Sequence, residues 1–218
     1  MSISTLVRIP AGPVTLEGML EIPEPAVGLV LFAHGSGSSR LSPRNNYVAG
    51  VLRQAGIGTL LMDLLTPVED RDYDRRFDIA LLTQRLLDAA RWVVSQPVTR
   101  ELPLGFFGAS TGAAAALEAA AILGPDARAV VSRGGRPDLA SREALRTVMA
   151  PTLLLVGGLD DIVIELNQRT YDQLQCEKEL VIVPGATHLF EEPGTLEDVA
   201  RRAAAWFAAH LPALSPRR

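Results

Sequence analysis

The strongest chemical signal in the sequence is a serine between two glycines. Residues 108–112 read Gly-Ala-Ser-Thr-Gly, which is a G-x-S-x-G pattern. The apolar run Leu102–Phe107 precedes it and an alanine-rich run follows it, which predicts a sharp turn between a strand and a helix. Glycines two residues either side of Ser110 remove side chains that would collide with that strand and helix. Ser110 is therefore the candidate nucleophile, and an ordinary glycine-rich turn that begins a helix is the alternative.

A serine hydroxyl is a poor nucleophile at neutral pH, so it needs an imidazole to take its proton. The chain has three histidines, His34, His188 and His210. Only His188 lies on a loop after a late strand, where it can reach a serine at the end of an earlier one. His210 falls near the end of the last predicted helix, where a surface position suits the helix dipole. His188 is the candidate general base, and a loop histidine bonded to solvent or backbone is the alternative.

The imidazole in turn needs a carboxylate that fixes its tautomer and stabilises its charged form. Asp160 and Asp161 follow the apolar run Pro151–Val156 and a Gly-Gly pair, which gives the chain order Ser, Asp, His. We favour Asp160, because it comes soon after the tight glycine turn, whereas Asp161 is placed to cap the next helix. Glu165 is a more distant candidate.

Ester or amide cleavage also needs hydrogen-bond donors for the oxygen that becomes negative. Two backbone N–H groups are predicted to form this oxyanion hole. One belongs to Thr111, next to the nucleophile, and the other to Ser36, in the small-residue loop 34–39. The alternative for this loop is a phosphate cradle, but it lacks the third glycine of G-x-G-x-x-G and the lysine of a P-loop.

Four arginines follow predicted strands at the same edge of the molecule: Arg40, Arg44, Arg133 and Arg136. We name Arg40 and Arg133 as candidate substrate-binding residues, because a guanidinium can hold an anionic acyl or leaving group. The alternative is that these arginines form salt bridges to Asp63 or Asp138 and only hold loops together.

The order of elements along the chain predicts how these residues meet. Two alternating runs, residues 5–9 and 14–22, predict an antiparallel hairpin. Continuous apolar runs follow at 28–33, 58–62, 102–108, 127–131, 151–156 and 179–183, and helices are predicted near 44–54, 77–95, 112–123, 137–147, 164–175 and 195–209. This alternation predicts a three-layer α/β fold with a mostly parallel eight-stranded sheet, whose ligands bind at the carboxyl ends of the strands. The long charged connection 63–76 either shapes a pocket at this edge or is a solvated charge cluster.

The composition fits one compact domain, and we assign residues 1–218 to it. The chain has 218 residues, of which 48% are hydrophobic, and a formal net charge of −4. No global positive field attracts a phosphate backbone, so nucleic acid is not an expected partner. The chain starts without the apolar segment of a secretory signal, and its longest apolar stretch, Ala113–Leu123, is too short to span a bilayer. We therefore expect a cytoplasmic protein without a membrane segment.

Three motifs together resemble the α/β-hydrolase superfamily and, within it, the small dienelactone hydrolase-like group. GASTG, GGLDD and GATH fall after the fifth, seventh and eighth predicted strands, and HGSGSSRLSPRN and SRGGRPDLA resemble hydrolase domains that are sometimes fused to phosphoribosyltransferases. The resemblance implies an antiparallel second strand, a Ser110–His188–Asp160 catalytic triad, an oxyanion hole from Ser36 and Thr111, and no cap domain.

The sequence departs from this group at two places. Dienelactone hydrolases have cysteine as the nucleophile, where this chain has Ser110 and its single cysteine, Cys176, lies far along the chain. Those enzymes also bind the substrate carboxylate with an arginine one turn after the histidine, where Glu191 and Glu192 stand here. Dienelactone itself is therefore not the expected substrate.

The residues favour a serine hydrolase that cleaves carboxylic esters of small acyl groups through an acyl-enzyme, without a metal or organic cofactor. A thioesterase, amidase or acyltransferase with the same triad is the alternative within enzymes, because specificity lies in pocket shape. A hydrolase fold that binds a small ligand without turnover is the alternative from another class.

Overall fold

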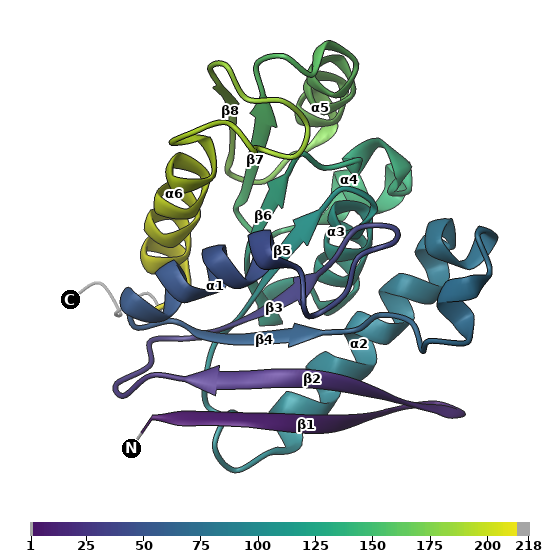
Figure 1. The fold of residues 1–218 in the computed structure, drawn as a ribbon, viewed down its shortest axis with the longest axis vertical. Helices are drawn as coiled ribbons and strands as arrows, with labels where there is room; N and C mark the ends of the chain where they lie inside the picture. The colour runs from purple at the N-terminus through teal and green to yellow at the C-terminus, as the bar shows by residue number, and fades with distance from the viewer. Residues whose placement is uncertain (1, 213–218) are drawn as a thin grey trace.

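The computed structural model describes residues 2–212 and contains one eight-stranded sheet (Figure 1). Its strands are β1 (Ile3–Ala11), β2 (Val14–Ile22), β3 (Leu29–Ala33), β4 (Gly58–Met62), β5 (Leu104–Ala109), β6 (Ala127–Arg133), β7 (Thr152–Gly157) and β8 (Lys178–Val183). They lie in the order β1-β2-β4-β3-β5-β6-β7-β8. Strand β2 is antiparallel to both of its neighbours, and the pairs from β4 to β8 are parallel. The predicted hairpin and mostly parallel sheet are confirmed.

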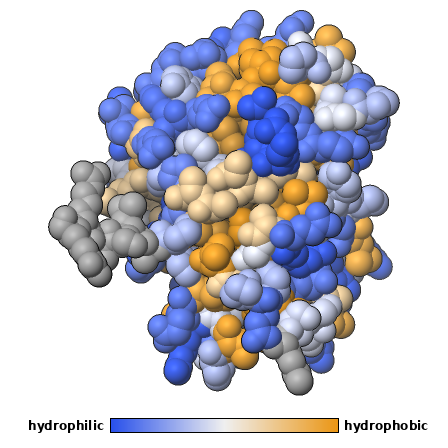
Figure 2. Space-filling model, turned by 90° about the vertical axis from the view of Figure 1, so that its left-hand side faces the viewer, coloured by the Kyte–Doolittle hydropathy of each residue, from blue (hydrophilic) through white to orange (hydrophobic). Residues whose placement is uncertain are grey.

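Helices cover both faces of the sheet (Figure 1). They are α1 (Pro43–Gln54), α2 (Ile79–Ser95), α3 (Thr111–Leu123), α4 (Arg142–Thr147), α5 (Asp161–Gln173) and α6 (Thr195–His210). One buried cluster packs α2 and α3 against the sheet, and a second packs α1 and α6 against the other face. On the side of the molecule at the left of Figure 1, apolar residues form a central band flanked by hydrophilic ones (Figure 2).

Strands β3, β4, β5 and β7 are buried along their whole length, which explains why their sequences are continuous apolar runs. Helix caps mark where the chain leaves the sheet. The Ser42 side chain accepts a hydrogen bond from the Asn45 N–H at the start of α1, and the Asp78 side chain accepts one from Leu81 at the start of α2. Because the strands from β3 to β8 are parallel, their carboxyl ends all lie at one edge of the sheet, where the connecting loops begin.

Two predicted helices were wrong in their boundaries. The predicted helix 137–147 is a 3₁₀ turn, Pro137–Leu139, followed by the short α4, because the Ser141 hydroxyl caps a new helix by accepting from the Ala144 N–H. Helix α5 begins at Asp161 rather than near residue 164, because the chain turns directly from the glycine pair into the helix at Asp160.

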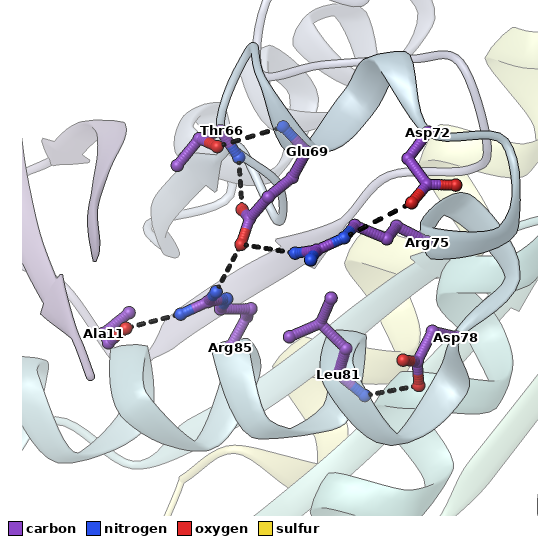
Figure 3. A network of polar contacts seen from close by, with 8 residues as sticks. All are labelled: Ala11, Thr66, Glu69, Asp72, Arg75, Asp78, Leu81 and Arg85. Carbon is purple, nitrogen blue, oxygen red and sulfur yellow. Dashed lines mark hydrogen bonds and ion pairs between the residues drawn. The ribbon is translucent and has the colours of Figure 1, made fainter. Parts of the chain in front are cut away.

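The long connection between β4 and α2 is fixed by a buried charge network (Figure 3). The Glu69 carboxylate accepts hydrogen bonds from the Thr66 N–H at 2.9 Å and from Arg85 Nη2 at 2.8 Å. Arg85 also donates to the carbonyl oxygen of Ala11 in the hairpin. Burial by itself raises the pKa of Glu69, but the Thr66 amide and the Arg85 charge outweigh it and hold the pKa below its usual range. This part of the predicted charge cluster is therefore ionised and buried, and it ties the connection to both α2 and β1.

Candidate active site

Ser110 occupies a strained turn between β5 and α3. Its φ of 51° lies in the left-handed region, which is costly for a residue with a side chain. Three backbone hydrogen bonds hold it there: the Ser110 N–H donates to the Arg133 carbonyl at 3.3 Å, and the Ser110 carbonyl accepts from Ala113 at 3.1 Å and from Arg136 at 2.9 Å. The turn therefore presents Ser110 at the carboxyl edge of the sheet, at the predicted position.

Both glycines of the G-x-S-x-G pattern are required by close packing. A Cβ atom on Gly112 would lie 2.1 Å from the carbonyl oxygen of Ala33 at the end of β3. A Cβ atom on Gly108 would lie 2.4 Å from the Cα of Ala113 in the first turn of α3. Because both obstacles are backbone atoms, no side-chain movement can relieve them, and only glycine fits at either position.

His188 and Asp160 are in direct contact. His188 Nδ1 lies 2.6 Å from Asp160 Oδ2, and the side chains are 40% and 17% exposed. The Asp160 carboxylate makes no cap bond to α5, so it is available to the imidazole. Asp161 is the first residue of α5 and is exposed, so the expectation that Asp161 caps this helix was wrong, because the helix starts one residue too early for it.

The end of β6 connects the serine turn with the histidine loop. The Arg133 carbonyl accepts from the Ser110 N–H, as described above. At the next residue, a Cβ atom on Gly134 would lie 3.0 Å from the carbonyl oxygen of His188 and 3.7 Å from His188 Cε1. The end of β7 also touches this loop, because a Cβ atom on Gly157 would lie 2.5 Å from the carbonyl oxygen of Ala186. The three predicted segments thus meet at one edge of the sheet.

His34 has a structural environment. Its ring is buried between two backbone groups: the Leu64 N–H donates to Nε2 at 2.9 Å, and Nδ1 lies 2.9 Å from the Gly35 carbonyl oxygen. Burial lowers the pKa of His34, so the ring is neutral at neutral pH. Because Nε2 accepts, Nδ1 carries the proton and donates to Gly35, which fixes the start of the loop that follows β3.

The two predicted oxyanion-hole residues, Ser36 and Thr111, touch each other. The Ser36 N–H donates to the hydroxyl oxygen of Thr111 at 3.1 Å. The loop also lies against the serine turn, because a Cβ atom on Gly35 would be 2.9 Å from Ser110 Cβ. The contact between the Ser36 N–H and the Thr111 hydroxyl was not predicted from the sequence. The presence of a threonine does not by itself indicate which backbone N–H its side chain will contact.

Arg40 and Arg136 form salt bridges to Asp63 and Asp138, which is the alternative given above for these arginines. Arg40 is bound to Asp63 through both its side chain and its backbone N–H, and its Nη2 lies 2.7 Å from Glu17 Oε2. Arg136 forms a two-bond pair with Asp138, at 2.9 and 2.8 Å.

Arg133 has a different environment from Arg40. It is 7% exposed, its Nη2 lies 3.3 Å from Asn45 Oδ1, and its guanidinium lies 6.0 Å from the centre of the Phe190 ring. Within residues 2–212, its Nε has no hydrogen-bond partner and no carboxylate forms an ion pair with it. Burial and the charge of nearby Arg44 lower the pKa of Arg133 to about 10, which leaves it protonated at neutral pH.

Arg76 was not singled out in the sequence, although it lies beside the oxyanion loop. Its Nη1 would be 3.6 Å from a Cβ atom on Gly37, and its Nε donates to the Asp70 carbonyl at 2.7 Å. It lines a cavity of about 10 Å³ together with Ser36 and Thr111. The connection between β4 and α2 thus reaches the site, but no sequence signal separates Arg76 from the other arginines of that segment.

The remaining candidates lie elsewhere. His210 hydrogen-bonds through Nδ1 to the Trp206 carbonyl at 2.8 Å, and Cys176 Sγ lies 3.7 Å from Thr152 Oγ1, at the opposite end of β7 from Asp160. The described part of the chain contains no group of three or more His, Cys, Asp or Glu side chains placed to hold a metal ion. Among residues 2–212, no helix combines the length and apolar character needed to cross a membrane.

Comparisons with known proteins agree with this architecture. A dienelactone hydrolase from Anabaena variabilis is similar in structure, with a TM-score of 0.93 and 55% identity over 96% of this chain and 99% of that one. Est1E from Butyrivibrio proteoclasticus and the esterase domain of a Rhodothermus marinus protein have TM-scores of 0.79 and 0.77, at 16% and 20% identity, over at least 94% of each chain. No family model matches the chain.

The sheet order, the strained serine turn and these structures define an α/β-hydrolase. At 55% identity over almost the whole of the Anabaena protein, the chain belongs to the dienelactone hydrolase-like family of hydrolases. It is also 59% identical over 205 residues to a Mycobacterium tuberculosis protein provisionally named a phosphoribosyl transferase, and it spans about half the length of that relative.

We expect Gly112→Ala to lower the free energy of unfolding by about 3 kcal/mol, because the added Cβ overlaps a backbone carbonyl that cannot move without shifting β3. Urea unfolding followed by circular dichroism measures the change. Gly50→Ala, in the middle of α1, is the matched control, because its Cβ would meet only Arg53 Nη2 at 3.8 Å. This substitution should raise the free energy of unfolding by at most about 1 kcal/mol. A Gly112→Ala protein as stable as the parent would contradict the packing described here.

Proposed function

We propose that this chain is a serine hydrolase that cleaves carboxylic esters with small acyl groups. The observation that carries the proposal is the 2.6 Å contact between His188 Nδ1 and Asp160 Oδ2 at the edge where strained Ser110 stands. With its Nδ1–H donated to Asp160, the imidazole keeps Nε2 free to take a proton. That is the arrangement that acyl transfer to a serine requires.

In this mechanism Ser110 Oγ attacks the ester carbonyl while His188 Nε2 takes the hydroxyl proton. The tetrahedral intermediate collapses, the C–O bond to the alcohol breaks, and His188 returns the proton to the leaving alkoxide. Water then attacks the acyl-enzyme as His188 takes its proton, and the acid leaves as Ser110 is reprotonated. Asp160 accepts the hydrogen bond from His188 Nδ1 throughout and stabilises the imidazolium.

The comparisons support ester chemistry. A lactone is a cyclic ester, so the activity in the name of the Anabaena protein is the same acyl transfer, and the two more distant proteins are named as esterases. The transferase name belongs to a protein of which the match covers 46%, and we do not extend it to this chain. A thioesterase or amidase with the same three residues is the alternative that substrate panels would reveal.

The direct test is labelling with a fluorophosphonate, which reacts with serines activated by a neighbouring base. We expect intact-mass spectrometry to show one adduct on the parent protein and none on Ser110→Ala. Absence of labelling on a folded parent protein would remove the main support for a serine mechanism. Equal labelling of both proteins would show that a different residue is the nucleophile.

Substitution of each of the adjacent residues Asp160 and Asp161 tests which of them is the acid that orients His188. We expect Asp160→Asn to lower kcat on a short-chain nitrophenyl ester by about 10³–10⁴-fold, because an asparagine at this position favours the wrong imidazole tautomer. Asp161→Asn should leave kcat within about twofold, since Asp161 is exposed and does not contact the imidazole. A larger loss in Asp161→Asn would reassign the acid.

For substrate binding, Arg133 is the better supported of the two arginine candidates, because Arg40 is already neutralised by Asp63 and Glu17. A buried guanidinium with one neutral partner at 3.3 Å favours an anion nearby. We expect Arg133→Met to lower kcat/KM at least tenfold more for a monoester of a dicarboxylic acid than for the uncharged ester of equal length. Arg128→Met, on the exposed opposite end of β6, is the control, and equal losses on both esters would make Arg133 a structural residue.

A further inference from the structure

The Ser36 amide is directed by a turn in the loop after β3. The Ser38 N–H donates to the Gly35 carbonyl at 3.1 Å, and Gly37 has a φ of 68°. A turn of this kind uses the N–H of its last residue and leaves the N–H of its second residue free. That free N–H belongs to Ser36, and it donates to the hydroxyl oxygen of Thr111 at 3.1 Å.

The Thr111 hydroxyl is buried and lies beside the reacting serine. Thr111 is 2% exposed, follows Ser110 directly and is the first residue of α3. A hydroxyl has one proton to donate and two lone pairs that accept. The Thr111 oxygen accepts from Ser36, and the structure gives its proton no acceptor among residues 2–212.

Thr111 Oγ1 and a substrate oxygen would both accept from the Ser36 N–H. Two oxygens that accept from one N–H lie close to each other, so the Thr111 hydroxyl borders the space that this substrate oxygen would fill. A substrate oxygen held by the Ser36 N–H would lie about 3 Å from that nitrogen, and Thr111 Oγ1 already lies 3.1 Å from it. Rotation about the Cβ–Oγ1 bond alone turns the hydroxyl proton toward such an oxygen without breaking the bond from Ser36. A hydrogen bond that a group accepts also strengthens the one that it donates.

We propose that the Thr111 side-chain hydroxyl is a third donor of the oxyanion site, beside the backbone N–H groups of Ser36 and Thr111. The inference rests on the serine-hydrolase function proposed above. As Ser110 Oγ bonds to the carbonyl carbon, the carbonyl π pair moves to oxygen, and the hydroxyl donates its proton to that negative oxygen in a hydrogen bond. The Ser36 N–H is then shared between Thr111 Oγ1 and the negative oxygen in a three-centre hydrogen bond. No proton is transferred from the hydroxyl. Its hydrogen bond strengthens as negative charge develops on the carbonyl oxygen, so it stabilises the transition state more than the bound substrate.

An opposite role for this hydroxyl makes the opposite prediction. If the hydroxyl only competed with the negative oxygen for the Ser36 N–H, removing it would free a donor for that oxygen and raise kcat. As a donor to the oxyanion, its removal lowers kcat and leaves KM nearly unchanged, because the bond strengthens in the transition state. The direction of the change in kcat therefore separates the two roles.

The test compares Thr111→Val, which keeps the shape and loses the hydroxyl, with Thr111→Ser, which keeps the hydroxyl. We expect kcat on a neutral short-chain ester to fall about 10- to 100-fold in Thr111→Val with KM within about threefold, and Thr111→Ser to retain kcat within about fivefold. Thr83→Val is the matched control, because Thr83 is also buried and its hydroxyl has no hydrogen-bond partner within the described chain. Its kcat should equal that of the parent.

Two results would overturn the proposal: a kcat in Thr111→Val equal to or above that of the parent, or a loss in Thr111→Ser as large as in Thr111→Val. Thermal unfolding by circular dichroism checks the fold, and Thr111→Ala replaces the valine variant if that one does not fold. A parent protein without turnover or fluorophosphonate labelling would instead refute the serine-hydrolase function. An active parent with an unaffected Thr111→Val would refute this inference alone.

Discussion

The geometry of the site depends on one close approach between two pieces of backbone, the end of β3 and the first turn of α3. No side-chain carbon fits between them, because a Cβ atom on Gly112 would lie 2.1 Å from the Ala33 carbonyl oxygen. This contact places the N-terminus of α3 against the loop after β3, so the Ser36 amide and Thr111 become neighbours. The strained φ of Ser110 follows from the same contact, since the chain must reverse within one residue to enter a helix that close to the sheet.

The strain at Ser110 is balanced by one bond from its own turn, from Ala113, and by two bonds to the segment at the end of β6. Its N–H and carbonyl bond to Arg133 and Arg136, which flank the end of β6. The same segment contacts His188 through Gly134. A single stretch of chain thus fixes the serine and borders the histidine, so the relative placement of these two residues is a property of the sheet and not of flexible loops.

Most of the fold was predictable because most buried strands are continuous apolar runs and most helices begin or end near a cap, a glycine or a proline. Ser110, Asp160 and His188 could be named as candidates because each lies near glycines after a predicted strand and their order along the chain is informative. The break near Ala140 was missed because a serine within a helical pattern does not by itself show that it caps a new helix. Partners distant in sequence were also beyond reach: nothing local indicates that Arg40 pairs with both Glu17 and Asp63, or that Arg85 lies beneath Glu69.

Charge at this edge is divided between groups that are neutralised internally and groups that are not. Glu69, Arg85 and Arg40 are neutralised within the protein, and His34 is uncharged. Arg133 is charged and buried, and its hydrogen bond goes to a neutral amide. A charge of this kind costs free energy in the absence of an anion. The anion-binding role proposed above would offset this cost, because an anion at the guanidinium would supply the charged partner that residues 2–212 do not.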